Sequence, residues 1–196
     1  MNESANVTSP RPPGLTISYE IMTPEEEAAL IALFGECGLA TNAYDPGNPR
    51  SSVSFGWKYD FQNDSFIPCA PIPERLWKVC GTAARLAGVE PDAFAECLIN
   101  RYEPGAIIQP HRDKPVWELV IGISLGSAAV MTFSKPAEQG GDSIDILLPP
   151  RSLYMMSGEA RHLYNHSLPP VAATRWSITL RTFSAEGLRL RDRYAA

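Results

Sequence analysis

The sequence predicts an α+β, mainly β fold: a double-stranded β-helix, or jelly roll, with N-terminal helices packed against one sheet. Two helical segments lie in the first half of the chain, and short strand-like segments separated by tight turns fill the second half. Closely spaced strands in this number are typical of a jelly roll, which helices can cover on one side. The strand-like segments are residues 97–103, 107–111, 117–125, 130–134, 143–148, 152–156, 162–165 and 175–183.

The first half of the chain begins with a segment that we expect to be a disordered tail. Residues 1–14 contain three prolines and no hydrophobic periodicity. Residues 15–22 then form a short strand. Thr23, Pro24 and Glu26 start a helix, because they provide an N-cap, a proline at the first helical position and the acid of a capping box.

Two further elements complete this half. Residues 73–88 form an amphipathic helix that starts at a proline and stops at a glycine, and we expect it to pack against the outside of the sheet. Residues 52–61 form a strand whose one face is apolar and predicts sheet core. That face carries Val53, Phe55, Trp57, Tyr59 and Phe61.

Composition and charge indicate one soluble domain. The chain has 196 residues, of which 44% are hydrophobic, and a length of this order can bury a genuine core. The first residues lack the basic and apolar regions typical of a signal peptide, and no apolar run is long enough to span a bilayer, so we expect a cytoplasmic protein. The net charge of -5 argues against nucleic-acid binding by bulk electrostatics, although it permits a local basic rim. The four cysteines lack Cys-x-x-Cys spacing, which favours reduced, buried thiols.

His111 and Asp113 form a His-x-Asp pair that indicates a metal site. Residues i and i+2 of a β-strand project from the same face, so the imidazole and the carboxylate can converge on one point. A distant histidine would complete a two-histidine, one-carboxylate set, which holds octahedral Fe(II) and leaves three positions open. The remaining histidines are His162 and His166, and spacing does not choose between them. The alternative is that the tripeptide occurs by chance and each histidine caps a turn or bonds a backbone carbonyl.

The last strand-like segment alternates strictly between two kinds of side chain. Its apolar face must pack against other apolar groups. Its polar face either meets solvent, as in an ordinary edge strand, or lines the interior. In the interior its two arginines would need anionic partners, because an unpaired buried charge is very costly, and a dicarboxylate ligand would supply them. The polar face carries Arg175, Ser177, Thr179 and Arg181, and the apolar face carries Trp176, Ile178 and Leu180.

Seven motifs, taken in order, resemble the AlkB family of Fe(II)- and 2-oxoglutarate-dependent dioxygenases, which oxidatively dealkylate nucleic-acid bases. The resemblance covers roughly residues 51–183. The motifs are Asn100-Arg-Tyr102, the following Pro-Gly-Ala, the pair His111/Asp113, Ile-Ser-Leu-Gly at 123–126, Gly158-Glu-Ala-Arg161, His166-Ser-Leu-Pro169, and the segment from Arg175 to Arg181.

The resemblance implies a metal site made of His111, Asp113 and His166. His166 is chosen because the Ser-Leu-Pro that follows it is similar to the segment after the family's third ligand, and His162 is the runner-up. The implied cofactors are Fe(II), 2-oxoglutarate, which chelates the iron, and O₂. An N-methyl group hydroxylated in this way would leave the base as formaldehyde.

The resemblance also implies how the co-substrate is held. The far carboxylate of 2-oxoglutarate would pair with Arg175, aided by Asn100 and Tyr102, while Arg181 would lie near the iron-bound end. A guanidinium suits this role because it makes two parallel charge-assisted bonds to a carboxylate. Ser177 would complete the pocket where an asparagine is common in the family.

By the same resemblance, residues 15–94 comprise the helices and a lid that recognises the nucleotide, residues 95–184 form the catalytic core, and residues 185–196 are a C-terminal tail. These are parts of a single domain. Trp57 is the candidate for stacking on the substrate base, with Tyr59 in reserve.

The implied partner is alkylated DNA or RNA, presented as a single strand or as a flipped-out base. We expect the protein to be a monomer that does not associate with membranes. Lys114 is a candidate substrate contact, and Arg50, Lys58 and Arg112 are further candidates for phosphate contacts. Pro115 stands where some relatives carry an acidic residue near the base.

Two other functions are compatible with the sequence. The enzyme could hydroxylate or demethylate a protein or small molecule, which the acidic composition would suit better. The chain could instead be a jelly-roll binding module that has lost its chemistry, in which case mutation of His111 would change little.

Overall fold

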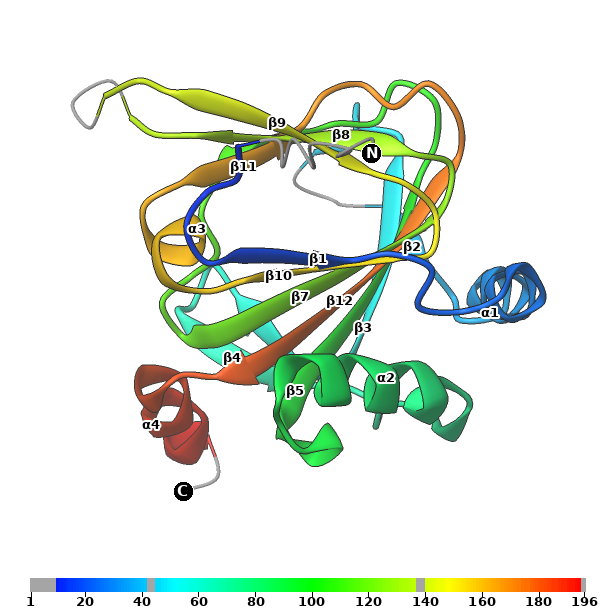
Figure 1. Cartoon of the computed structure of the whole chain (residues 1–196). Helices are drawn as coiled ribbons and strands as arrows, with labels where there is room; N and C mark the ends of the chain where they lie inside the picture. The colour runs from blue at the N-terminus through cyan, green and yellow to red at the C-terminus, as the bar shows by residue number, and fades with distance from the viewer. Residues whose placement is uncertain (1–9, 42–44, 137–139, 195–196) are drawn as a thin grey trace, which may run out of the picture.

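The computed structural model describes residues 10–41, 45–136 and 140–194, and its strands form two facing sheets with helices outside the larger one (Figure 1). The larger sheet has eight strands in the order β1-β10-β7-β12-β5-β3-β2, with β4 paired to β3, and the smaller has the order β6-β11-β8-β9. This arrangement confirms the predicted jelly roll. The strands are β1 (Leu15–Ser18), β2 (Ala40–Thr41), β3 (Arg50–Asp60), β4 (Ser65–Pro68), β5 (Phe94–Tyr102), β6 (Ile108–His111), β7 (Trp117–Gly126), β8 (Ala129–Ser134), β9 (Ser143–Leu148), β10 (Ser152–Met156), β11 (Asn165–Leu168) and β12 (Arg175–Phe183).

The helices are short and lie at the periphery. Helix α1 begins with the predicted capping box, in which Thr23 and Glu26 each bond the other's backbone N–H. Within the described residues, no helix has both the length and the apolar character needed to cross a membrane. The helical segments are α1 (Pro24–Gly35), the 3-10 turn η1 (Glu74–Leu76), α2 (Trp77–Ala87), the 3-10 turn η2 (Pro91–Ala93), α3 (Gly158–His162) and α4 (Ala185–Tyr194).

Two predicted elements differ from the structure. The strand predicted at 162–165 is not formed, because α3 ends at His162 and β11 starts only at Asn165. A four-residue segment is too short for its alternation to be distinguished from a helix end. The predicted tail at 185–196 begins as helix α4, whose residue Gly187 approaches the backbone of Val116 so closely that a side chain would not fit.

Part of the predicted N-terminal tail has a defined position. Residues 1–9 lie outside the described part of the chain, but residues 10–14 are placed against the start of α3. The backbone N–H and the hydroxyl of Ser157 both donate to the carbonyl of Gly14 at 3.0 Å. All four cysteines are free thiols as predicted, although Cys37 and Cys69 are only half-buried.

The two faces of the larger sheet differ in chemistry, and this difference positions the site. Trp176 of β12 packs on Phe34 of α1, with ring centroids 5.7 Å apart, so the apolar face of that strand meets the helices. Arg181, on the opposite face, bonds Asp113 in the segment that follows β6 of the smaller sheet. The polar face of β12 therefore looks into the space between the sheets, and the edge-strand alternative is wrong.

Glu27 joins α1 to the sheet, and we expect its loss to destabilise the fold. Its carboxylate is buried and accepts bonds from the N–H of Gly126 at 2.7 Å and from Arg151 at 2.9 Å. Glu27→Ala should lower the free energy of unfolding by about 1–3 kcal/mol, because a partly buried donor and a guanidinium lose their acceptor. Urea denaturation measures the change, with Glu25→Ala at an exposed position of the same helix as control. Equal losses in the two variants would contradict the assigned role.

Candidate metal and co-substrate site

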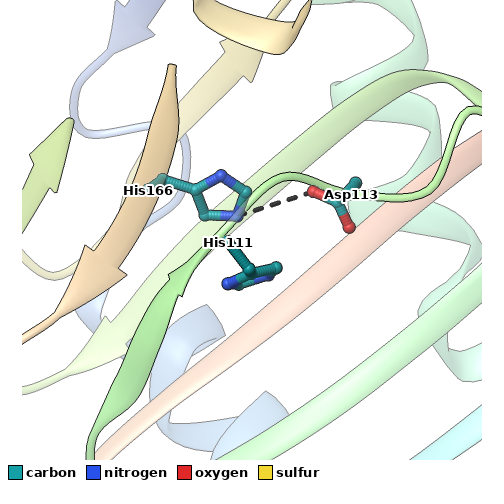
Figure 2. Close-up of side chains that lie close together, drawn as sticks. All are labelled: His111, Asp113 and His166. Carbon is teal, nitrogen blue, oxygen red and sulfur yellow. Dashed lines mark ion pairs between the residues drawn. The ribbon is translucent and has the colours of Figure 1, made fainter. Parts of the chain in front are cut away.

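Pairing of β6 with β11 brings together the three residues expected to hold the metal. His166 lies opposite His111 in the antiparallel register, and the two ring centroids are 4.3 Å apart. Asp113 follows two residues after His111, and one potential ligand atom from each of the three lies within 4.8 Å of the others. Figure 2 shows the imidazole of His166 pointing toward Asp113, with His111 beside it. His162 ends α3 with an exposed side chain outside this cluster, so the structure favours His166 over the runner-up.

Both imidazoles can offer a ring nitrogen to a metal. The Nδ1 atom of His111 lies 2.9 Å from the carbonyl oxygen of Gln109. A carbonyl only accepts, so Nδ1 carries the proton and Nε2 keeps its lone pair for a metal. Burial lowers the pKa of His166 to about 4, an effect that the nearby Asp113 carboxylate only partly offsets. His166 is therefore uncharged at neutral pH.

Asp113 presents one free oxygen to this pair. Its Oδ1 accepts from Nε and Nη2 of Arg181, at 3.1 and 2.6 Å. Its Oδ2 is buried, lies 3.5 Å from Nε2 of His166, and has no hydrogen-bond partner among the described residues. Burial alone would raise the pKa of the Asp113 carboxyl, but Arg181 and then the two imidazoles lower it well below its ordinary value. An ionised oxygen beside two imidazoles is the donor set that suits a divalent transition metal such as Fe(II).

Glu96 is part of this site, although the sequence analysis gave it no role. Its Oε2 accepts from Nη1 of Arg181 at 2.6 Å, and its Oε1 accepts from the hydroxyl of Ser54 at 3.1 Å. Arg181 is thereby held between two carboxylates. It fixes the position of Oδ1 of Asp113, so that Oδ2 faces the imidazoles. The sequence could have indicated this role, because Glu96 lies an even number of residues from Asn100 and Tyr102 on β5, and alternate residues of a strand share a face.

The residues expected to bind 2-oxoglutarate lie in two rows across neighbouring strands. Arg175 lies opposite Tyr102, and Ser177 lies opposite Asn100. The Arg175 side chain is 1% exposed, donates from Nε to the hydroxyl of Ser124 at 3.2 Å, and has a buried Nη2 without a partner among the described residues. A buried guanidinium with an unpaired N–H is suited to pair with the carboxylate of a ligand. The structure thus groups all the residues expected at this end of the site.

Comparison with known proteins identifies the family to which the chain belongs. Residues 51–190 match the family model of the 2OG-Fe(II) oxygenase superfamily. The chain is 30% identical over 155 residues to the alpha-ketoglutarate-dependent dioxygenase AlkB of Escherichia coli, a match that covers 69% of each protein. The chain belongs to the AlkB-like 2OG-Fe(II) oxygenases. The cofactors of these oxygenases are Fe(II), 2-oxoglutarate and O₂, and the donor set described above fits them.

A second relative and one solved structure are also similar to this chain. The tRNA (carboxymethyluridine(34)-5-O)-methyltransferase alkbh8 of Xenopus tropicalis is 32% identical over 167 residues, which are 81% of this chain. The chain spans only 26% of the length of that protein. The solved structure of OsALKBH1 superposes with a TM-score of 0.71 at 17% identity, over 88% of this chain and 97% of that chain, and supports the same fold.

Arg161 of this oxygenase holds the backbone segment that carries Asp113, and we expect its loss to weaken metal binding. The buried guanidinium donates to the backbone carbonyls of Asp113, Lys114 and Trp117 at 3.0, 2.7 and 2.8 Å. Arg161→Met should reduce the affinity for Mn(II) by about 10–100-fold, as is usual when a group that orients a metal ligand is lost. Isothermal titration calorimetry measures the change, with Arg112→Met, whose side chain is exposed, as control. Unchanged affinity would show that the segment after Asp113 holds its place without Arg161.

The two aromatic candidates for the substrate base lie in different surroundings. Trp57 packs edge-on against Phe66 and Phe183, each with ring centroids 6.3 Å away, and lines a cavity that also includes Trp77 of α2 and Leu188 of α4. Tyr59 lies by contrast next to Lys114, whose Nζ is 5.3 Å from the centre of the ring. The structure therefore places Tyr59, and not Trp57, beside the segment that carries Asp113.

Phe61 offers the more accessible ring of this oxygenase at the same place. It is 72% exposed, whereas Tyr59 is 4% exposed and bonds its hydroxyl to Asp64. The ring of Phe61 lies edge-on to Tyr59 at 5.0 Å, and Nζ of Lys114 lies 5.7 Å from its centre. From the sequence we placed Phe61 only on the apolar face of residues 52–61, although its position at the end of that strand could have indicated an exposed ring.

Proposed function

We propose that this chain is an Fe(II)- and 2-oxoglutarate-dependent dioxygenase that oxidatively dealkylates bases in DNA or RNA. The observation that carries the proposal is the buried Oδ2 of Asp113, which faces two imidazoles and accepts no hydrogen bond within the described residues. Buried polar atoms almost always have a hydrogen-bond partner, so an ionised carboxylate oxygen without one is suited to bind a cation.

Each residue of the site has a defined task in this reaction. His111, Asp113 and His166 would hold the iron on one side, and Arg181 keeps the Asp113 carboxylate ionised and oriented. Arg175 would bind the far carboxylate of 2-oxoglutarate. When bound, the iron, 2-oxoglutarate and O₂ together supply the oxidising power that places a hydroxyl group on the alkyl carbon of the base. On an N-methyl base, the C–N bond of the hydroxylated group then breaks. The carbon leaves as formaldehyde, and the nitrogen keeps the hydroxyl proton, which restores the base.

A polar cavity beside Asp113 supports a nucleic-acid substrate. It measures about 440 Å³ and is lined mainly by polar groups. Basic side chains at this position can contact phosphates while the net charge of the chain stays negative. A duplex would have to release the base into the site, which costs a few kcal/mol and less for single strands. The lining residues are Arg112, Asp113, Lys114, Pro115, Arg161, His162 and Asn165.

Formaldehyde release tests the proposed reaction. Matched DNA and RNA oligonucleotides carrying a single N-methyl base should yield formaldehyde and succinate in equal amounts, and His111→Ala should yield neither. The names of the relatives include both an AlkB dioxygenase and a tRNA-modifying protein, so both polymers belong in the assay. Turnover of 2-oxoglutarate without formaldehyde from either polymer would exclude base demethylation.

A second candidate keeps the same site but has a protein or small molecule as substrate. The net charge of -5 favours it, because an acidic surface repels polyanions. It predicts that 2-oxoglutarate turnover in the wild type rises with such a substrate and does not respond to oligonucleotides.

Phe61 gives a prediction specific to nucleic-acid substrates. Phe61→Ala should raise the KM for a methylated oligonucleotide by about 5–100-fold, because stacking of one base on an aromatic ring contributes about 1–3 kcal/mol. The turnover of 2-oxoglutarate without oligonucleotide should not change. Steady-state kinetics measures both, with the exposed Tyr19→Ala as control. A KM equal to that of the wild type would remove Phe61 from the substrate surface.

A further inference from the structure

Arg50 lies in the same row of side chains as Arg175, the arginine expected to bind 2-oxoglutarate. In the antiparallel register, Arg50 of β3 is opposite Tyr102 of β5, and Tyr102 is opposite Arg175 of β12. Directly opposed residues of antiparallel strands project from the same face. The three side chains therefore lie side by side on the face that looks into the space between the sheets, and Arg50 is not among the residues that line the polar cavity beside Asp113.

The contacts of Arg50 show that it is fixed in this place. Its Nε and Nη2 both donate to Oδ1 of Asn100, at 3.2 and 2.7 Å. Its Cζ lies 5.5 Å from the centre of the Tyr102 ring, and the Cζ of Arg175 lies 5.0 Å from the same centre. One aromatic ring thus contacts two guanidiniums.

The charge of this row is not balanced by the protein. Among the ion pairs formed by the described residues, none includes Arg50 or Arg175. Burial by itself would raise the pKa of the Tyr102 phenol, but the two guanidiniums outweigh burial and lower that pKa. Two neighbouring positive charges without an acid are costly away from bulk water, and an anionic ligand removes that cost.

The side-chain amide of Asn100 bonds two neighbouring side chains. Its Oδ1 accepts both bonds from Arg50, and its Nδ2 donates to the hydroxyl of Ser177 at 3.3 Å. Arg50 uses two of its five N–H donors in this contact and keeps three. Asn100 is therefore placed to orient Arg50, and the guanidinium is placed to meet a ligand.

We propose that Arg50 binds the far carboxylate of 2-oxoglutarate together with Arg175, and that Asn100 is a positioning residue for Arg50. The inference rests on the proposed dioxygenase function and adds a residue to its co-substrate site. It also explains how a serine is accommodated at position 177, because the second guanidinium supplies polar contacts that the short Ser177 side chain does not.

The test compares two ligands that differ only at the far carboxylate. Binding of 2-oxoglutarate and of 2-oxovalerate, which has a methyl group in place of that carboxylate, is measured by calorimetry with the Mn(II)-loaded protein. Arg50→Met should weaken 2-oxoglutarate binding by about 10–100-fold, as expected when a hydrogen-bonded charge loses its partner. Binding of 2-oxovalerate should change by less than about 3-fold, because a ligand that lacks the carboxylate has no interaction to lose.

Two further variants separate a direct contact from an effect on folding. Arg50→Lys keeps the charge but not the fork that bonds Asn100, so it should give an intermediate loss for 2-oxoglutarate. It also replaces Arg50→Met if that variant does not fold. Arg101→Met, at the next position of β5 on the other face of the sheet, is the matched control and should bind both ligands like the wild type.

Each outcome has a defined meaning. The role of Arg50 would be overturned if Arg50→Met bound both ligands equally more weakly, or if its affinity for 2-oxoglutarate did not change. Binding of 2-oxoglutarate by the wild type would still support the proposed function in that case. Failure of the wild-type Mn(II)-loaded protein to bind 2-oxoglutarate would instead overturn the dioxygenase assignment. A selective loss for 2-oxoglutarate supports both.

Discussion

Replacement of Asp113 by alanine is expected to abolish metal binding and all 2-oxoglutarate turnover. The variant removes the single anionic ligand of the site, whose Oδ2 lies 3.5 Å from Nε2 of His166. Loss of a direct ligand should exceed the roughly 10–100-fold effect of losing an outer partner. Mn(II) at about 100 times its Kd should stabilise the wild type by about 2.7 kcal/mol, and at the same concentration the variant by less than about 0.5 kcal/mol.

Chemical denaturation with and without Mn(II) measures this difference. Asp92→Ala, which removes an exposed carboxylate from η2, is the matched control and should keep the full stabilisation. The metal-free variant should remain folded, because Arg181 keeps its bond to Glu96. Stabilisation of Asp113→Ala by Mn(II) to the same extent as the wild type would show that the metal binds elsewhere.

Replacement of Arg175 by methionine is expected to weaken 2-oxoglutarate binding while leaving the free protein as stable as before. The guanidinium is 1% exposed with an unpaired Nη2, so it contributes an uncompensated buried charge when no ligand is present. Methionine is apolar and of comparable length, and such replacements of buried charges are often neutral or stabilising. In the complex, loss of the charge pair should cost about 2–5 kcal/mol, or at least about 30-fold in Kd.

The combination of the two effects makes this prediction specific. Calorimetry gives the Kd for 2-oxoglutarate with the Mn(II)-loaded protein, and urea denaturation gives the stability of the free protein. Arg85→Met, at an exposed position of α2, should change neither. A stability loss of several kcal/mol with unchanged Kd would assign Arg175 to the core rather than to the co-substrate.

Local patterns were sufficient for several parts of this protein. The capping box of Thr23 and Glu26 involves neighbours on one helix end, so the start of α1 could be predicted. The alternation from Arg175 to Arg181 placed the two arginines on one face, because side chains alternate along a strand whatever the tertiary structure. Neither pattern could show whether that face met solvent or the interior, since burial depends on the opposite sheet.

The sequence by itself determined the jelly-roll class, the His111/Asp113 pair and the shared face of Arg175 and Arg181, since each depends on residues close together in the chain. Only the tertiary structure brought His166 against the His111/Asp113 pair by joining β11 to β6, and it joined Glu96 to Arg181. It also placed Arg50 beside Tyr102, and it placed Trp57 among the aromatic rings near α4. These choices depend on strand register. Register joins residues that are far apart in sequence, and a shift of one residue would turn each of these side chains to the other face.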